Sequence, residues 1–112
     1  MTVADTIKIE DFQKIKIQVG KVLTCEKVQD SSKLLKLRVS FGDHERVVFS
    51  GIAKHYESFQ LIGNKYVFVT NLEPRKIKDE ISEGMILASE DSSGKVSLLV
   101  PNQDVAEGSL VG

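Results

Sequence analysis

The sequence has few of the residues that build disulfide-bonded or metal-stabilised folds. Its 112 residues include one cysteine, two prolines and no tryptophan, and aromatic residues make up only 6%. A single cysteine excludes an internal disulfide framework and a multi-cysteine metal site. No run approaches the roughly 20 apolar residues of a membrane span, and the polar segment 1–10 lacks the apolar centre of a signal peptide. The sequence therefore predicts a soluble, cytoplasmic protein with no membrane partner.

The sequence also lacks a large excess of positive or negative charge. Fifteen Lys and Arg residues stand against sixteen Asp and Glu residues, which gives a formal net charge of −1. A polyanion would therefore need a local cluster of cations, because the chain as a whole provides no attractive field. Hydrophobic residues reach 41%, enough for the packed core of one domain of common size. Residues 1–6 show no periodicity and are expected to form a flexible N-terminal arm.

Alternating apolar and polar residues predict strands in much of the chain. Apolar positions alternate from Ile15 to Val19, and the phase then changes at Gly20. A glycine inside a strand pattern indicates a bulge or a bend, which a small closed barrel requires. Residues 34–41 alternate clearly, which predicts an apolar face toward the core, with Lys36 and Arg38 facing outward.

The rest of the pattern predicts the order of the elements. The expected segments are a helical turn near 9–15, a strand at 46–49, a helix at 52–59 capped by Ser50, a strand at 65–72, and a hairpin of 85–89 with 95–100. The order β-β-β-α-β-β with a bent first strand is typical of the OB-fold. We therefore expect an all-β, five-stranded Greek-key barrel over residues 7–100, with a short helix between strands 3 and 4. Residues 101–112 would be a C-terminal extension.

The segment 71–76 combines an amide, a guanidinium and an ammonium after a short apolar strand. Pro74 fixes its own φ and pushes the preceding residue toward extended conformations, so Arg75 and Lys76 are expected on a shaped turn. A guanidinium fork suits phosphates and base edges. A solvated loop that closes a hairpin is the alternative interpretation, since loops of this kind are common.

Several motifs together resemble one family. They are Ile9-x-x-Phe12, Val19-Gly20-Lys21-Val22, Ser32 to Leu37, Arg46, Ser50-Gly51-Ile52-Ala53-x-x-Tyr56, Asn71-Leu72-x-Pro74-Arg75-Lys76 and Ser82-x-Gly84-Met85. From about Ile7 onward, the chain resembles the tRNA-binding domain at the C-terminus of many bacterial methionyl-tRNA synthetases. Similar domains occur in stand-alone structure-specific tRNA-binding proteins and in endothelial monocyte-activating polypeptide-like proteins.

The resemblance implies a module that binds tRNA of any identity, forms a homodimer and needs no cofactor. The catalytic part of a methionyl-tRNA synthetase would be a further partner. The residues that the resemblance and the cation pattern assign to tRNA are Lys33, Lys36, Arg46, Asn71, Arg75, Lys76, Ser82 and Met85. Each has a structural alternative: an outward strand position for the lysines, a cross-strand ion pair for Arg46, a turn or cap for Asn71 and Ser82, and the core for Met85.

The C-terminal stretch carries more apolar residues than the last strand of a small barrel needs. These residues are Leu98, Leu99, Val100, Val105, Leu110 and Val111. Pro101 stops regular pairing, so the tail is expected to run along the surface as an extended segment. Its exposed apolar groups favour a second copy of the chain as the cover, related by a two-fold axis. The alternative is that the tail folds back on its own barrel.

Catalysis is not expected. His44 and His55 have no partner pattern, Cys25 has no base near it in sequence, and no phosphate-binding or dinucleotide-binding glycine motif occurs. The competing function is an export-related, chaperone-like module on the same scaffold, which would use an apolar groove at the dimer interface. A small enzyme is a remote third class.

Overall fold

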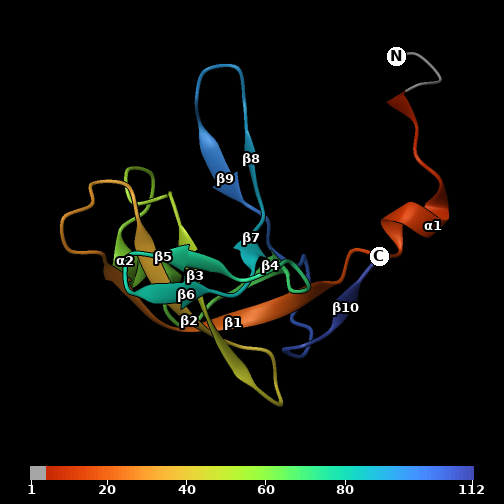
Figure 1. The fold of residues 1–112 in the computed structure, drawn as a ribbon, viewed down its shortest axis with the longest axis horizontal. Coiled ribbons are helices and arrows are strands. Elements are labelled where there is room, and N and C mark those ends of the chain that lie inside the picture. Colours follow the sequence, from red (N-terminus) through yellow and green to blue (C-terminus); the bar gives the residue numbers. More distant parts are fainter. Residues whose placement is uncertain (1–4) are drawn as a thin grey trace.

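A curved antiparallel sheet forms the body of the molecule in the computed structural model, which describes residues 5–112. Five strands follow the order β3-β2-β1-β4-β7, and β10 pairs beside them with β1 (Figure 1). Their bounds are β1 Ile17–Lys27, β2 Leu35–Ser40, β3 Glu45–Ser50, β4 Lys65–Val69, β7 Met85–Ile86 and β10 Leu110–Val111. The alternation in residues 34–41 and in the first strand therefore predicted real strands.

Strand β1 is long enough to serve two neighbours. Its first part pairs with β4, from Ile17 to Lys21, and its second part pairs with β2, with a shift in register between Val22 and Thr24. This shift lies just beyond Gly20, the residue at which a bulge or bend was expected. A Cβ at Gly20 would lie 2.6 Å from Val39 and 2.7 Å from Phe41, so glycine lets core side chains reach the strand backbone.

The sheet curls until its two ends meet. The Glu83 amide donates to the Val47 carbonyl at 2.8 Å, which brings the segment before β7 against β3. The inward face is the core predicted from the alternation, with Leu35, Leu37 and Val39 fully buried. The nearly closed barrel of five antiparallel strands confirms the expected OB-like fold.

Two small hairpins lie outside this barrel. They are β5 Arg75–Ile77 with β6 Glu80–Ser82, and β8 Ala88–Glu90 with β9 Val96–Leu98. Figure 1 shows β8 and β9 projecting away from the sheet. The sequence analysis missed the first hairpin, because strands of three residues are too short for a periodic signal. It also joined Met85 to the second hairpin, whereas Met85 pairs with Val69 of β4.

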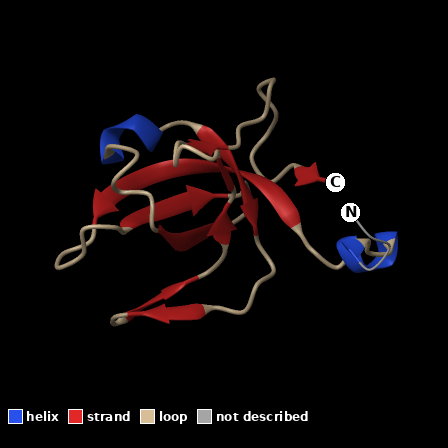
Figure 2. Ribbon diagram, turned by 90° about the horizontal axis from the view of Figure 1, so that it is seen from above, coloured by secondary structure: helices blue, strands red, loops and turns tan. Residues whose placement is uncertain are grey.

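Both helices are single turns. Helix α2 spans Ser58–Leu61, so the expected helix over 52–59 is wrong in its position. Glu57 precedes it and exchanges hydrogen bonds with Gln60, a capping box that takes the role expected of Ser50, which ends β3. Helix α1 spans Ile9–Phe12, buries none of its residues and stands clear of the sheet in Figure 2. Residues 1–4 of the predicted arm lie outside the described residues.

The C-terminal segment folds back onto its own barrel, which was the alternative interpretation of the tail. Leu110 pairs with Gln18 and Val111 with Ile17, at the start of β1 and before the stretch that pairs with β2. The Val19 amide donates to the Ser109 carbonyl at 2.9 Å, and the Gly108 amide donates to the Val19 carbonyl at 2.7 Å. The last residues of the tail are therefore paired with β1 of the same subunit. Among the described residues, no helix is long and apolar enough to cross a membrane.

Candidate nucleic-acid interface

Residues 75–82, called here the cationic hairpin, carry the most exposed part of the predicted site. Arg75 and Lys76 are both exposed, and they lie on β5 and not on a turn as expected. Because side chains alternate along a strand, the two cations point to opposite faces of the hairpin. Arg75 lies opposite Ser82 and Lys76 lies opposite Ile81. One cation is thus directed to each side of a thin, two-stranded element.

Salt bridges and hydrogen bonds fix the hairpin against the barrel. The Lys36 ammonium lies 2.5 Å from a Glu80 carboxylate oxygen and 3.9 Å from a Glu26 oxygen. The hydrogen bond with Glu80 raises the pKa of Lys36 above its ordinary value, although partial burial opposes this. Lys78 at the tip donates to the Gln29 carbonyl at 2.5 Å. Lys36 was predicted as an RNA contact, but here its charge is engaged by carboxylates and it anchors the hairpin.

A groove runs between the two hairpins and the segment after β3. We call it the hairpin groove; its volume is about 380 Å³. Arg75, Met85 and His55 line it, and Met85 is exposed. A guanidinium beside a polarizable apolar side chain can hold a phosphate and pack against the base next to it. The structure thus brings Arg75 and Met85 of the predicted set together.

Asn71 and Ser82 have structural partners. The Asn71 Oδ1 accepts from the Lys16 amide at 2.8 Å, and its Nδ2 donates to the Lys14 carbonyl at 2.6 Å. Ser82 is 1% exposed, and its hydroxyl accepts from the Phe49 amide at 3.0 Å. Burial removes Ser82 from the surface that RNA would meet, which corrects its proposed role as a direct contact. Asn71 remains at the surface, but both ends of its amide are occupied.

The other predicted cations are less connected. The Arg46 guanidinium donates to the Thr70 carbonyl, so it holds β3 near the end of β4. Lys33 is exposed, and its carbonyl accepts from the Ala53 amide at 2.9 Å. Among the described residues, no hydrogen bond or ion pair joins Lys33 to the cationic hairpin. A continuous surface of Lys33, Lys36, Arg75 and Lys76 therefore stays a prediction.

Sequence reasoning missed the place of His55 in the hairpin groove. It treated this residue as part of a helix, whereas residues 53–55 form a turn and the helix begins at Ser58. No local signal marks the groove, because it is assembled from segments that are far apart in sequence. Lys78 was also missed; it adopts a positive φ of 57° at the hairpin turn.

The predicted dimer residues divide into two groups. Leu98 is buried in the core cluster, so it packs within its own subunit, which corrects its expected place at an interface. The other five remain exposed: Leu99, Val100, Val105, Leu110 and Val111. The last two line a cavity of about 600 Å³ with Ile9, Phe12 and Ile15, which we call the terminal groove. Its wall is mainly apolar, with Lys14 and Lys16 among its polar residues, and segments near both ends of the chain form it.

The candidate nucleophile Cys25 has no activating surroundings. It is buried, and burial together with the Glu26 charge raises the pKa of its thiol to about 11, so it stays protonated at neutral pH. His44 lies 2.6 Å from the Asp43 carboxylate in an exposed turn. Within residues 5–112, no group of three or more His, Cys, Asp or Glu side chains is arranged to hold a metal ion.

Comparison with known proteins finds relatives over nearly the whole chain. A family model described as "Putative tRNA binding domain" matches residues 17–110. A methionine–tRNA ligase from Porphyromonas gingivalis is 48% identical over 109 residues. This match covers 97% of the present chain but 16% of the ligase. The chain thus spans only a small part of the length of the curated relatives that it matches.

Solved structures share the fold over the same extent. The MetRS related protein from Pyrococcus horikoshii superposes with a TM-score of 0.92 at 36% identity, covering 96% of this chain and 99% of that one. The chaperone CsaA from Bacillus anthracis superposes with a TM-score of 0.87 at 27% identity, covering 96% and 99%. The same fold is therefore found in a protein described as MetRS related and in one described as a chaperone.

Proposed function

The chain belongs to the tRNA-binding domain family, and from this premise we propose that it is a non-catalytic module that binds tRNA without regard to base sequence. One observation carries the proposal: two exposed residues, Arg75 and Met85, line the same hairpin groove. This pairing offers a charged contact to a phosphate and an apolar contact to a base. Neither contact depends on the identity of the base.

Phosphate and shape recognition would dominate the binding. Phe41, Phe49 and Phe68 are buried in the core, so they offer no stacking platform to bases. The cations of the hairpin remain as the main attraction, and they act through counterion release. Folded tRNA presents phosphates in a fixed geometry, which an unstructured RNA of the same length does not.

A second copy of the chain is proposed to cover the terminal groove. Helix α1 buries no residue of its own, and Leu110 is 74% exposed. Apolar groups from both chain ends therefore form one uncovered surface, which a two-fold partner would bury. Two subunits would then present two Arg75 sites to one RNA, which raises avidity when the RNA reaches both.

The dimer can be tested with two residues of equal exposure. Phe59 and Leu110 are each 74% exposed, but only Leu110 lies at the terminal groove. Leu110→Glu should shift the mass measured by light scattering from dimer to monomer and weaken tRNA binding. Phe59→Glu should leave both unchanged. A monomeric parent protein at micromolar concentration would refute the dimer.

The module is proposed to act beside aminoacylation and not in it. Relatives described as methionine–tRNA ligases are much longer than this chain, so their chemistry would lie in a part that the chain does not match. The chain would act in the cytoplasm, either as an appended domain or as a stand-alone protein. Its contribution would be to hold tRNA near a methionyl-tRNA synthetase.

The central test is a tRNA titration at two or more salt concentrations. The double variant Arg75→Ala with Lys76→Ala should lower the affinity for unfractionated tRNA by about tenfold and flatten the salt dependence. The matched control, Lys8→Ala with Lys95→Ala, removes the same charge from exposed positions outside the hairpin groove. Equal effects of the two double variants would reject the proposed interface, and absence of binding by the parent protein would reject the function.

The terminal groove supports one other candidate function. The likeness to a chaperone and the exposed apolar groove fit a module that binds unfolded peptide segments. Such a module should slow the aggregation of an unfolded test protein, and Leu110→Glu should abolish this effect. Arg75→Ala should leave it unchanged, whereas the same variant should weaken tRNA binding. The two variants thus separate the two functions.

A further inference from the structure

Two lysines face each other on the side of the barrel formed by β1 and β4. Lys21 and Lys65 are register partners in this antiparallel pair, which places their Cβ atoms about 5 Å apart. Like charges at directly opposite positions destabilise a sheet unless an anion lies near them. Both lysines are half-buried, so their charges are held near this surface.

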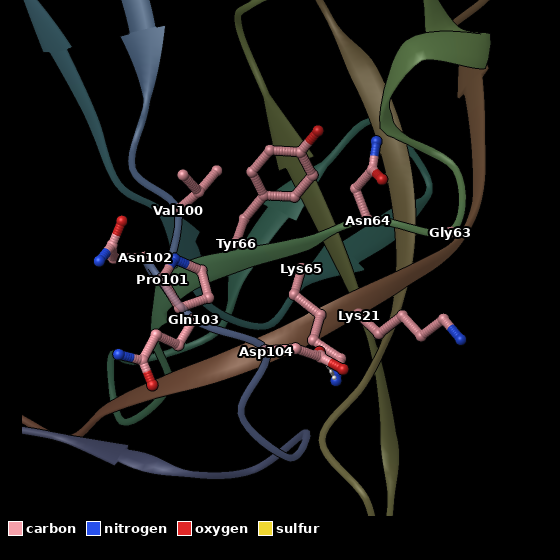
Figure 3. Close-up of a pocket in the computed structure, with 10 residues that line it drawn as sticks. All are labelled: Lys21, Gly63, Asn64, Lys65, Tyr66, Val100, Pro101, Asn102, Gln103 and Asp104. Carbon is pink, nitrogen blue, oxygen red and sulfur yellow. Dashed lines mark hydrogen bonds and ion pairs between the residues drawn. The ribbon is translucent and has the colours of Figure 1, made fainter.

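The C-terminal segment supplies the anion. The Lys65 ammonium donates to an Asp104 carboxylate oxygen at 2.8 Å and to the Val105 carbonyl at 2.7 Å. Lys65 and, more weakly, Lys21 hold the pKa of Asp104 below its ordinary value. In Figure 3, Lys21 extends away from Lys65, while the Lys65 ammonium lies beside Asp104. Among residues 5–112, the Lys21 ammonium has no hydrogen-bond or ion-pair partner.

This arrangement leaves the carboxylate exchangeable. The Asp104 side chain is 89% exposed, whereas that of Lys65 is 22% exposed. An exposed carboxylate on a surface ion pair contributes little to stability, so another anion can replace it at small cost. Asp104 neutralises only one of the two lysine charges, so a net positive charge remains at the pair.

A cavity of about 570 Å³ adjoins the pair. Its wall contains the amide side chains of Asn64, Asn102 and Gln103, and Asp104 is its one acid (Figure 3). The Asn64 amide nitrogen donates to the Gln60 carbonyl at 2.8 Å, so Asn102 and Gln103 are the better donors to a ligand. Two ammonium groups at the wall of one cavity suit a phosphate, which accepts several charge-assisted hydrogen bonds. The volume also accommodates a sugar attached to that phosphate.

We propose that Lys21 and Lys65 form a second phosphate-binding site for the RNA backbone, in which Asp104 occupies the phosphate position until RNA displaces it. The proposal rests on the proposed tRNA-binding function and extends it to another part of the barrel. No residue that lines this cavity also lines the hairpin groove. RNA that reaches both sites would be held at two separated phosphates, and the C-terminal segment would act as an internal competitor.

The decisive variant removes the competing charge. Asp104→Asn keeps the size of the side chain and should raise tRNA affinity about threefold at low salt, with a salt slope steeper by about one phosphate contact. Lys21→Gln should lower the affinity and flatten the slope by a similar amount. Lys21 is the cleaner choice of cation, because Lys65 also anchors the C-terminal segment.

The matched control addresses net charge. Glu45→Gln removes one negative charge from another exposed ion pair, Arg38–Glu45 at 3.5 Å. If Asp104→Asn and Glu45→Gln raise affinity equally, the gain is a general charge effect and the site is rejected. The site is also rejected if Lys21→Gln leaves the affinity and the slope unchanged while the parent protein binds tRNA. Failure of the parent protein to bind tRNA would instead reject the proposed function.

A second measurement does not need RNA. Titration of the Asp104→Asn protein with inorganic phosphate should shift the backbone amide NMR signals of Asn64 and Asn102, and the parent protein should show smaller shifts. Thermal unfolding of the variant should stay close to that of the parent, which excludes a loosened tail as the cause. Absence of any phosphate-dependent shift in the variant overturns the site. Shifts without a change in tRNA affinity overturn its assignment to RNA and indicate a site for free phosphate.

Discussion

The two hairpins outside the barrel have strands of equal length but opposite means of support. The cationic hairpin is fixed to the barrel by charged side chains, through Lys36 with Glu80 and Lys78 with the Gln29 carbonyl. The β8–β9 hairpin projects away from the sheet, and its turn is organised from within by the Asp91 carboxylate. Oδ1 of Asp91 accepts from the Ser93 amide at 2.9 Å and from the Lys95 amide at 3.0 Å.

This difference explains why some cations near the proposed interface are available to RNA and others anchor the hairpin. An anchored hairpin keeps Arg75 at a fixed position, which lowers the entropy lost when RNA binds. The anchoring itself uses Lys36, one of the cations first assigned to RNA. The β8–β9 hairpin needs no such anchor, since its turn carries its own hydrogen bonds and Leu98 is buried at its base.

The largest effect should come from the buried anchor of the cationic hairpin. Ser82→Ala leaves the buried Phe49 amide without its acceptor, so the free energy of unfolding should fall by about 1–3 kcal/mol. Because Ser82 pairs with Arg75 across the hairpin, tRNA affinity should fall as well. Denaturant unfolding and a tRNA titration measure the two effects.

The matched variant in the other hairpin is Ser97→Ala. Ser97 is exposed on β9, so its free energy of unfolding should change by no more than about 0.5 kcal/mol. A similar loss of stability in both variants would show that the two hairpins do not differ in their support.

A smaller effect should follow from releasing Lys36. Glu80→Gln removes the carboxylate that lies 2.5 Å from the Lys36 ammonium, and exposed pairs of this kind contribute about 0–1 kcal/mol. Stability should therefore change little. The released ammonium becomes available to phosphate, so tRNA affinity at low salt should rise about twofold to threefold, with a steeper salt dependence.

The control for this variant is Glu90→Gln, which makes the same charge change on β8. It should alter the salt slope less than Glu80→Gln does. A loss of tRNA affinity in the Glu80 variant would mean instead that the anchor outweighs the released charge.

The sequence predicted those features that depend on long periodic segments. Strand β2 and the buried side chains of Leu35, Leu37 and Val39 followed from alternation. The irregularity of β1 lies just beyond Gly20, which had indicated a bulge or bend. Strands of two or three residues, such as β5 and β7, hold too few positions for a period. Their pairing is set by contacts with distant segments, and no local pattern records such contacts.

The site was predictable by residue type but not by role. Arg75 and Lys76 are exposed, as the pattern of cations around Pro74 suggested. The local sequence around Ser82 and Leu98 does not distinguish them from exposed residues. Only the closed barrel shows that they are buried. Whether a polar residue contacts a ligand or holds the backbone depends on partners far away in sequence.

The smallest predicted effect concerns pH, and it separates the two hairpins. Lys36 has a pKa raised from 10.5 by its bond to Glu80, so the contribution of the Lys36 charge to the anchor is fully present below pH 10.5 and is lost as pH rises through the higher folded value. Asp91 has a pKa lowered from 3.8, chiefly by the Ser93 hydroxyl, so its turn is complete above pH 3.8 and is lost as pH falls through the lower folded value. The methyl signals of Ile81 should therefore move at alkaline pH, and those of Val96 at acid pH. Glu80→Gln should remove the first change and Asp91→Asn the second, and a response of Val96 at alkaline pH together with Ile81 would contradict separate means of support.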